Sequence, residues 1–116
     1  MAAATTNWPD DAGSATAVIE SLSGAVTDVD VGATAFPWRQ QAACIQWYTE
    51  PSAQAVGAAN DWLSSAHTAV GAYSAGGYVN YLETDTPASR YFGENTDRLG
   101  VVRQKYDPSG LMYSAV

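Results

Sequence analysis

The stretch ACIQWYTEPSAQAVGAANDWLSSAHTAVGAY, residues 43–73, decides the fold class. Its first six residues alternate in polarity, and successive side chains of a β-strand point to opposite faces of the sheet. The pattern therefore predicts a strand over residues 43–48. The apolar face of this strand carries Ala43, Ile45 and Trp47. The other face, which can meet a ligand or solvent, carries Cys44, Gln46 and Tyr48.

One long helix is predicted to follow this strand. Ser52, directly after Pro51, suits the N-cap position, and the helix is expected to run to about Tyr73. Apolar residues recur at helical spacing along one stripe. The stripe consists of Ala55, Val56, Ala59, Trp62, Leu63, Ala66, Val70 and Tyr73.

Upstream of this pair, residues 1–16 are small and polar, which is typical of a lead-in or linker. Residues 17–22 and 25–29 are rich in β-branched side chains and are separated by Ser23 and Gly24, which predicts two strands joined by a tight turn. Residues 33–39 are expected to form a loop, because Pro37 cannot sit in a central strand.

Downstream, two glycines break the helix and residues 78–83 read as a strand. A short helical turn over residues 88–92 is expected to end at Gly93. Asn95 or Thr96 then caps a final helix that Pro108 stops. The order of elements predicts one α+β domain over residues 17–116, with an antiparallel sheet covered on one face by helices.

Composition limits what this domain can be. At 116 residues with 47% apolar residues the chain is globular, but much of the apolar content is alanine, so the core is expected to be thin and to form one layer of a larger object. A net charge of −7 with five scattered basic residues argues against nucleic acid and anionic lipid as partners, although it leaves an anionic cofactor possible.

Other composition features exclude several kinds of site. The single cysteine, Cys44, rules out an internal disulfide and a zinc cluster, so no metal ligands are assigned. No apolar run approaches the roughly 20 residues needed to cross a bilayer, and the N-terminus does not read as a secretory signal. The cytoplasm is the default expectation for localisation.

Three segments, in this order, carry a resemblance to a known family. The first is Thr34-Ala35-Phe36-Pro37-Trp38-Arg39 with the later pair Gln46-Trp47. The second is Gly77-Tyr78-Val79-Asn80-Tyr81-Leu82-Glu83. The third is Tyr91-Phe92-Gly93-Glu94-Asn95-Thr96-Asp97-Arg98-Leu99, continued by Lys105-Tyr106-Asp107-Pro108. Over residues 17–110 the chain resembles the C-terminal portion of FAD-linked oxidases of the berberine bridge enzyme type.

The resemblance implies part of the substrate lobe of a bilobal flavin oxidase. The FAD-binding lobe is expected on another chain, with self-association as the alternative, and the isolated chain is expected to be inactive. Neither His67 nor Cys44 matches a flavin-tethering position of the family. Trp38 is a departure, since the family often has histidine between that proline and arginine.

Site residues carry over position by position. Tyr81 matches a tyrosine that serves as the catalytic base in several family members, and its alternative role is packing between sheet and helix. A free tyrosine has a pKa of roughly 10, so such a base needs neighbours that stabilise the phenolate. Tyr78 and Asn80 match flavin-lining residues, although strand alternation would place them opposite Tyr81. Asn95 either contacts the flavin or caps the last helix.

The remaining candidates are weaker. Gln46 and Tyr48, on the polar face of their strand, are candidates for lining a substrate cavity. Arg39 either pairs with a carboxylate of the missing lobe or is a solvated surface residue. His67, at the edge of the apolar stripe, is more typical of a packed or solvated histidine than of a functional one.

Together these residues predict a part or subunit of an FAD-dependent oxidoreductase that oxidises an alcohol, a sugar or an amine-type small molecule. The alternative is a flavin-free binding or interaction module derived from the same scaffold. A third possibility is an unrelated small α+β domain with fortuitous motif matches, which the ordered agreement of three segments disfavours.

Overall fold

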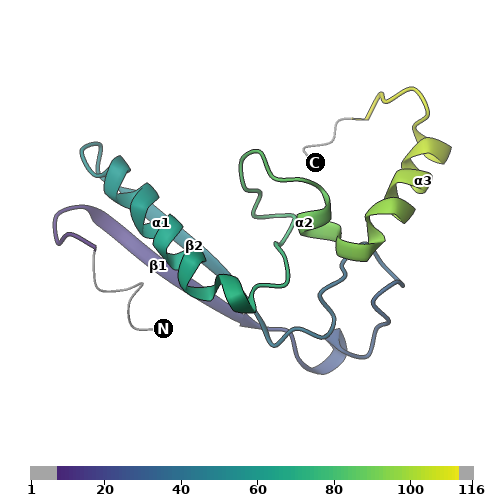
Figure 1. Cartoon of the computed structure of the whole chain (residues 1–116), viewed down its shortest axis with the longest axis horizontal. Helices are drawn as coiled ribbons and strands as arrows, with labels where there is room; N and C mark the ends of the chain where they lie inside the picture. The colour runs from purple at the N-terminus through teal and green to yellow at the C-terminus, as the bar shows by residue number, and fades with distance from the viewer. Residues whose placement is uncertain (1–7, 113–116) are drawn as a thin grey trace. The chain divides into compact units, whose positions relative to one another are not determined.

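The structure is a computed structural model that describes residues 8–112 (Figure 1). The chain divides into two compact units, one made of residues 1–21 and 43–74 and the other of residues 22–42 and 75–116. We call them the sheet unit and the loop–helix unit. Each is α-helical in part, and the sheet unit adds an antiparallel sheet, so the predicted α+β class is confirmed.

The sheet unit contains two strands and one long helix. Strand β1 (Gly13–Ser21) pairs antiparallel with β2 (Ala43–Pro51), and Ala17 lies opposite Trp47. Helix α1 (Val56–Val70) runs along this ribbon, followed by a 3-10 turn (Gly71–Tyr73) (Figure 1). The predicted strand over residues 43–48 is therefore confirmed, as is its position beneath a helix.

Three indole rings meet in the sheet unit around the buried Trp62. The ring centroid of Trp62 on α1 lies 5.8 Å from that of Trp47 on β2 and 6.1 Å from that of Trp8, both edge-to-face. Trp62 is only 5% exposed, and its indole Nε1 is buried without a hydrogen-bond partner. Aromatic burial of this kind replaces the large aliphatic core that the alanine-rich composition cannot provide.

The boundaries and burial of α1 correct two details of the prediction. Ser52 is not the N-cap: its N–H donates to the Ala12 carbonyl at 2.9 Å, and Ala55 precedes the helix without a side-chain cap. The buried face is also narrower than the predicted stripe, because Val56 is 50% and Tyr73 89% exposed. The buried residues of this face are Ala55, Ala59, Trp62 and Ala66.

The partner of β1 differs from the predicted one. Residues 25–29 do not form a strand, so the predicted hairpin with residues 17–22 is wrong. Gly24 has a left-handed φ of +65° and begins a 3-10 turn (Gly24–Val26). The Thr27 N–H and hydroxyl both donate to the Gly24 carbonyl, which closes the turn locally. Strand β1 also begins within the predicted lead-in of residues 1–16, of which residues 1–7 lie outside the described part of the chain.

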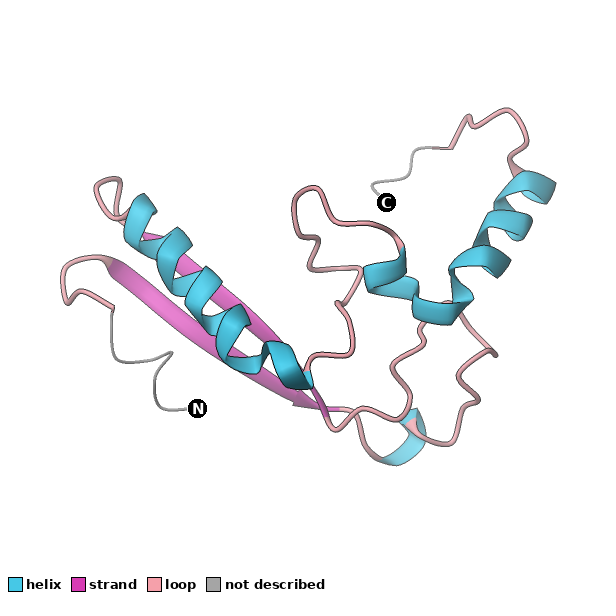
Figure 2. Cartoon of the chain, in the orientation of Figure 1, coloured by secondary structure: helices cyan, strands magenta, loops and turns pink. Residues whose placement is uncertain are grey.

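The loop–helix unit consists mainly of loops with two helices (Figure 2). Helix α2 (Ser89–Phe92) leads through a 3-10 turn (Gly93–Asn95) into α3 (Thr96–Tyr106). Gly93 ends α2 with a φ of +49°, as predicted. The loop over residues 33–39 is also confirmed.

At the end of helix α3 the Asp107 side chain binds the backbone that follows the helix. The helix stops at Tyr106, one residue before the buried Asp107, whose two carboxylate oxygens accept the Leu111 and Met112 N–H groups. Asp97 lies in the first turn and two basic residues in the last, which suits the helix dipole. The apolar side chains of this helix are poorly covered, since Val102 is 44% and Tyr106 69% exposed.

The strand predicted over residues 78–83 is wrong. The Tyr81 N–H donates to the Tyr78 carbonyl at 2.8 Å, which closes a turn instead of joining a ladder. Tyr91 of α2, only 2% exposed, holds the far end of this segment, because its hydroxyl accepts the Glu83 N–H at 2.7 Å.

Among residues 8–112, no helix is long and apolar enough to cross a membrane.

Candidate functional site

The turn after Gly77 brings three predicted site residues together. The ring centroids of Tyr78 and Tyr81 lie 5.3 Å apart at 84°, an edge-to-face pair. The Asn80 amide Nδ2 donates to the Tyr78 hydroxyl at 2.7 Å. The expectation that strand alternation separates Tyr81 from the other two is therefore wrong, because the backbone turns here.

The loop of residues 34–39 extends this aromatic cluster. The Phe36 ring meets Tyr78 edge-to-face at 6.2 Å, and the Arg39 guanidinium lies 5.0 Å from the centre of the Phe36 ring. Arg39 also donates to the Thr34 hydroxyl at 2.8 Å. It is thus half-buried against its own loop, which contradicts the description of a freely solvated arginine.

Of the two tyrosines in this cluster, Tyr81 is the more exposed. Its side chain is 37% exposed, whereas that of Tyr78 is half-buried between Phe36 and Tyr81. A partly exposed phenol that is held by a ring contact can stand against a planar group or exchange a proton with a bound molecule. We call Phe36, Tyr78, Asn80 and Tyr81 the tyrosine cluster.

Trp38 connects the loop to the start of the turn. Its indole Nε1–H donates to the Gly77 carbonyl at 2.8 Å. A Cβ added to Gly76 would lie 1.9 Å from the Trp38 ring, so only glycine fits at this approach. The sequence marked Trp38 as a departure from the family pattern but gave no signal for this contact, which spans 39 positions.

Asn95 lies apart from the tyrosine cluster in its contacts. The side chain is 8% exposed, and its Nδ2 donates to the carbonyls of Val31 at 2.8 Å and Thr34 at 3.1 Å. It occupies the N-cap position of α3 but makes no side-chain cap. Of the two predicted roles, capping is therefore wrong, and the amide ties the residue 31–34 loop to the helix.

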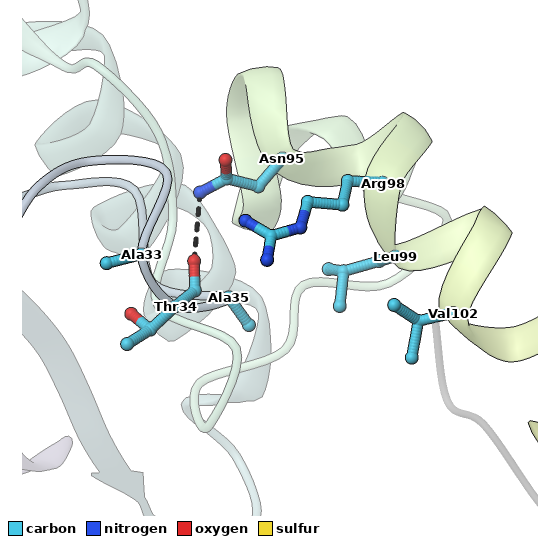
Figure 3. A pocket seen from close by; sticks show the side chains of 7 residues that line it. All are labelled: Ala33, Thr34, Ala35, Asn95, Arg98, Leu99 and Val102. Atoms are coloured by element: carbon cyan, nitrogen blue, oxygen red, sulfur yellow. Dashed lines mark hydrogen bonds between the residues drawn. The ribbon is translucent and has the colours of Figure 1, made fainter.

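A shallow hollow of about 200 Å³ opens beside Asn95 (Figure 3). It is bounded by the residue 33–35 loop and the first two turns of α3, and the Arg98 side chain lies across it. The Arg98 guanidinium donates to the Gly32 carbonyl. This hollow lies between the loop and α3. Its volume is smaller than that of typical ligand pockets, which span roughly 300–1,000 Å³.

The predicted substrate-lining residues belong to the sheet unit. Gln46 is half-buried on β2, and Tyr48 is 46% exposed on the same strand face. The Tyr48 hydroxyl donates to Glu50 Oε1 at 2.8 Å. This hydrogen bond, reinforced by the negative charge of Glu50, raises the pKa of the Tyr48 phenol, so Tyr48 stays protonated and is unsuited to act as a base.

Cys44 and His67 complete the set of chemically distinctive side chains. Burial, and then the negative charge of Glu20, raise the pKa of the Cys44 thiol. His67 is exposed on α1. Within residues 8–112, no group of three histidine, cysteine or carboxylate side chains could hold a metal ion.

The raised pKa of Cys44 predicts slow alkylation, because the thiolate is the reactive form. For the folded chain, the midpoint of the iodoacetamide rate against pH should lie above that of the urea-unfolded chain. Glu20→Gln should lower the midpoint, whereas Asp61→Asn, at an exposed residue of α1 in the same unit, should leave it unchanged. A folded-state midpoint at or below the unfolded one would contradict this account.

The fold and the site together define an α+β chain that presents a partly exposed tyrosine pair on a tight turn. Residues 77–114 match the family model described as berberine and berberine like. This segment therefore resembles the C-terminal region of an FAD-linked oxidoreductase family, as its motifs predicted. No curated protein and no solved structure gave a significant match.

Proposed function

We propose that this chain is the C-terminal part or subunit of an FAD-linked oxidoreductase that oxidises an alcohol, a sugar or an amine-type small molecule. The supporting observation is that the matched segment, residues 77–114, starts at the turn that gathers Tyr78, Asn80 and Tyr81. The same turn leaves Tyr81 37% exposed, available to a flavin or a substrate.

The described residues suit one wall of a flavin site and not a whole one. The tyrosine cluster offers aromatic edges and an amide, which are suitable for lining a planar ring system. The hollow of about 200 Å³ beside Asn95 is too small to enclose a dinucleotide. The proposal therefore requires an FAD-binding lobe outside the described residues to supply the rest of the flavin site.

When bound, FAD would accept a hydride from the substrate carbon. The role of this chain is to accept the proton that leaves the substrate oxygen or nitrogen. In the proposal Tyr81 is the base that accepts a proton from the substrate hydroxyl or amine, and the Tyr78 ring holds the Tyr81 ring in place. The Tyr78 hydroxyl accepts the Asn80 amide hydrogen, so its own O–H stays available to donate a hydrogen bond, and such a bond to the Tyr81 oxygen would favour the phenolate form that a base requires.

Tyr81→Phe in the assembled enzyme tests this role. It removes the hydroxyl and keeps the ring contact with Tyr78, so flavin binding should be retained. Loss of a positioned base should slow flavin reduction by substrate about 100-fold or more. Stopped-flow absorbance measures the reduction rate, and the flavin-to-protein ratio measures binding.

Tyr106→Phe is the matched control, since that phenol is 69% exposed on α3 outside the tyrosine cluster. It should reduce flavin at the unmodified rate. If Tyr81→Phe is as fast as Tyr106→Phe, Tyr81 is not the base.

The alternative, a flavin-free binding or interaction module, is supported by a different observation. The Asn95 amide hydrogens are committed to two backbone carbonyls of its own chain, so one of the three proposed cofactor contacts already has a structural role. A stable chain that takes up neither FAD nor a partner polypeptide would favour this alternative.

A further inference from the structure

We propose that Trp38 is a positioning residue for the tyrosine cluster and that its indole N–H, more than its ring volume, sets the place of Tyr78 and Tyr81. The catalytic meaning of this inference rests on the proposed function. The positional claim rests only on contacts within the loop–helix unit.

Trp38 holds the peptide immediately before the turn. Its Nε1–H donates to the Gly77 carbonyl at 2.8 Å in a partly buried setting. The Gly77 N–H donates in the opposite direction, to the Arg90 carbonyl at 2.7 Å. Gly77 is thus fixed through both its amide and its carbonyl, and the next residue is Tyr78.

The Trp38 ring is itself held between two glycines. A Cβ on Gly76 would lie 1.9 Å from Cζ2 of Trp38, and one on Gly93 would lie 3.3 Å from Cη2. The absence of side chains at both positions lets the planar indole enter between the turn and the end of α2. This close fit fixes the direction in which the N–H points.

The neighbouring residue Phe36 gives the same loop a second contact with the cluster. Phe36 contacts the Tyr78 ring at 6.2 Å, and Pro37 between Phe36 and Trp38 is buried. One short loop therefore supplies a ring to Tyr78 and a hydrogen bond to the residue before it. A change at Trp38 should reach Tyr81 through Gly77 and Tyr78 without a direct contact.

Trp38→Phe removes the N–H and leaves the Gly77 carbonyl without this donor. Hydrogen exchange of the Gly77 and Tyr81 amides, measured by NMR on the 116-residue chain, should accelerate about 5- to 150-fold, the effect of leaving one part-buried acceptor unpaired. Nuclear Overhauser cross-peaks between the Tyr78 and Tyr81 rings should weaken. Exchange of the Asp107 amide, at the end of α3, should not change.

A second variant keeps the ring shape. Trp38→3-benzothienylalanine replaces the N–H by sulfur in a bicycle of nearly the same size, and it should reproduce the Trp38→Phe pattern. Trp62→Phe is the matched control, because its buried Nε1 has no hydrogen-bond partner to lose. It should leave the exchange of the Gly77 and Tyr81 amides unchanged.

Unchanged Gly77 exchange and unchanged Tyr78–Tyr81 cross-peaks in the benzothienylalanine variant would overturn the proposal. Acceleration of every amide, including that of Asp107, would also overturn it, since the role would then be general stability. In the assembled oxidase the same variant should slow flavin reduction with substrate affinity retained. If Tyr81→Phe does not slow reduction, the proposed function fails while the NMR result still decides the positional claim.

Discussion

Gly76→Ala is expected to lower the free energy of unfolding of the loop–helix unit by about 2–5 kcal/mol. The added Cβ would lie 1.9, 2.3 and 2.6 Å from three carbon atoms of the Trp38 ring, far inside the roughly 3.5–4.0 Å at which carbon atoms pack. A rigid indole cannot yield by bending. It must swing away, which breaks its 2.8 Å hydrogen bond to the Gly77 carbonyl.

Gly100→Ala supplies the control for this substitution. Gly100 lies within α3, and an added Cβ there meets nothing within 4 Å. Alanine is the better helix former, so this variant should be more stable by about 0.5–1 kcal/mol. Urea unfolding followed by amide NMR signals of the loop–helix unit compares the two variants.

A double variant identifies the cause. If the overlap with the indole is the reason for the loss, Trp38→Ala combined with Gly76→Ala should cost less than the sum of the two single substitutions. Additive losses, or a Gly76→Ala variant as stable as Gly100→Ala, would show that the turn is not packed against Trp38.

Asn95→Asp is expected to cost about 3–5 kcal/mol at neutral pH, the second large effect. The Asn95 amide is 8% exposed and donates to the carbonyls of Val31 and Thr34. A carboxylate has no hydrogen to donate, so the substitution leaves a buried charge facing two carbonyl oxygens. Urea unfolding at neutral pH measures the loss.

The sign of the pH dependence follows from the same geometry. Burial and the two carbonyls disfavour the charged form, so the pKa of the new carboxyl should be higher in the folded than in the unfolded chain. The folded state then binds the proton more tightly, and the lost stability should return in part as the pH falls through that raised pKa.

Asn60→Asp on the exposed side of α1 is the comparison, and it should change stability by less than about 0.5 kcal/mol. Equal, small effects at both positions would contradict the structural role of Asn95 and return it to the list of residues that face a ligand.

The elements that the sequence predicted well are those whose patterns are local. Residues 43–48 alternate in polarity because one face of the strand packs against the helix. The helical spacing of Ala59, Trp62 and Ala66 arises in the same way, and the two faces meet where Trp47 contacts Trp62. The stop at Gly93 likewise depends on one glycine adopting a positive φ.

The elements that it predicted wrongly depend on distant partners. Residues 17–22 and 25–29 both have strand-like composition, but composition does not choose a partner, and β1 pairs with a strand whose residues lie 22–38 positions further on. Residues 78–83 also have strand-like composition. Their turn is fixed by Trp38 and Tyr91, at distances in the sequence that no local pattern records.

The candidate site shows the same division. The family motif brought Tyr78, Asn80 and Tyr81 to attention as site residues, and the structure places them in one cluster through a turn that alternation did not anticipate. Asn95 has the residue type and position of a helix cap, yet its amide bonds to carbonyls more than 60 positions away. Gln46 and Tyr48 stay predictions as substrate-lining residues, with Tyr48 held protonated by Glu50.

The visible absorption spectrum of the protein purified from its native source, with all polypeptides in the same sample identified, tests the central claim most directly. The account predicts flavin absorption bands together with a larger co-purifying polypeptide that carries the FAD-binding lobe. A colourless sample that contains this chain alone would contradict it. The tyrosine cluster would then be inherited from a flavin-binding ancestor and would have no catalytic role in this protein.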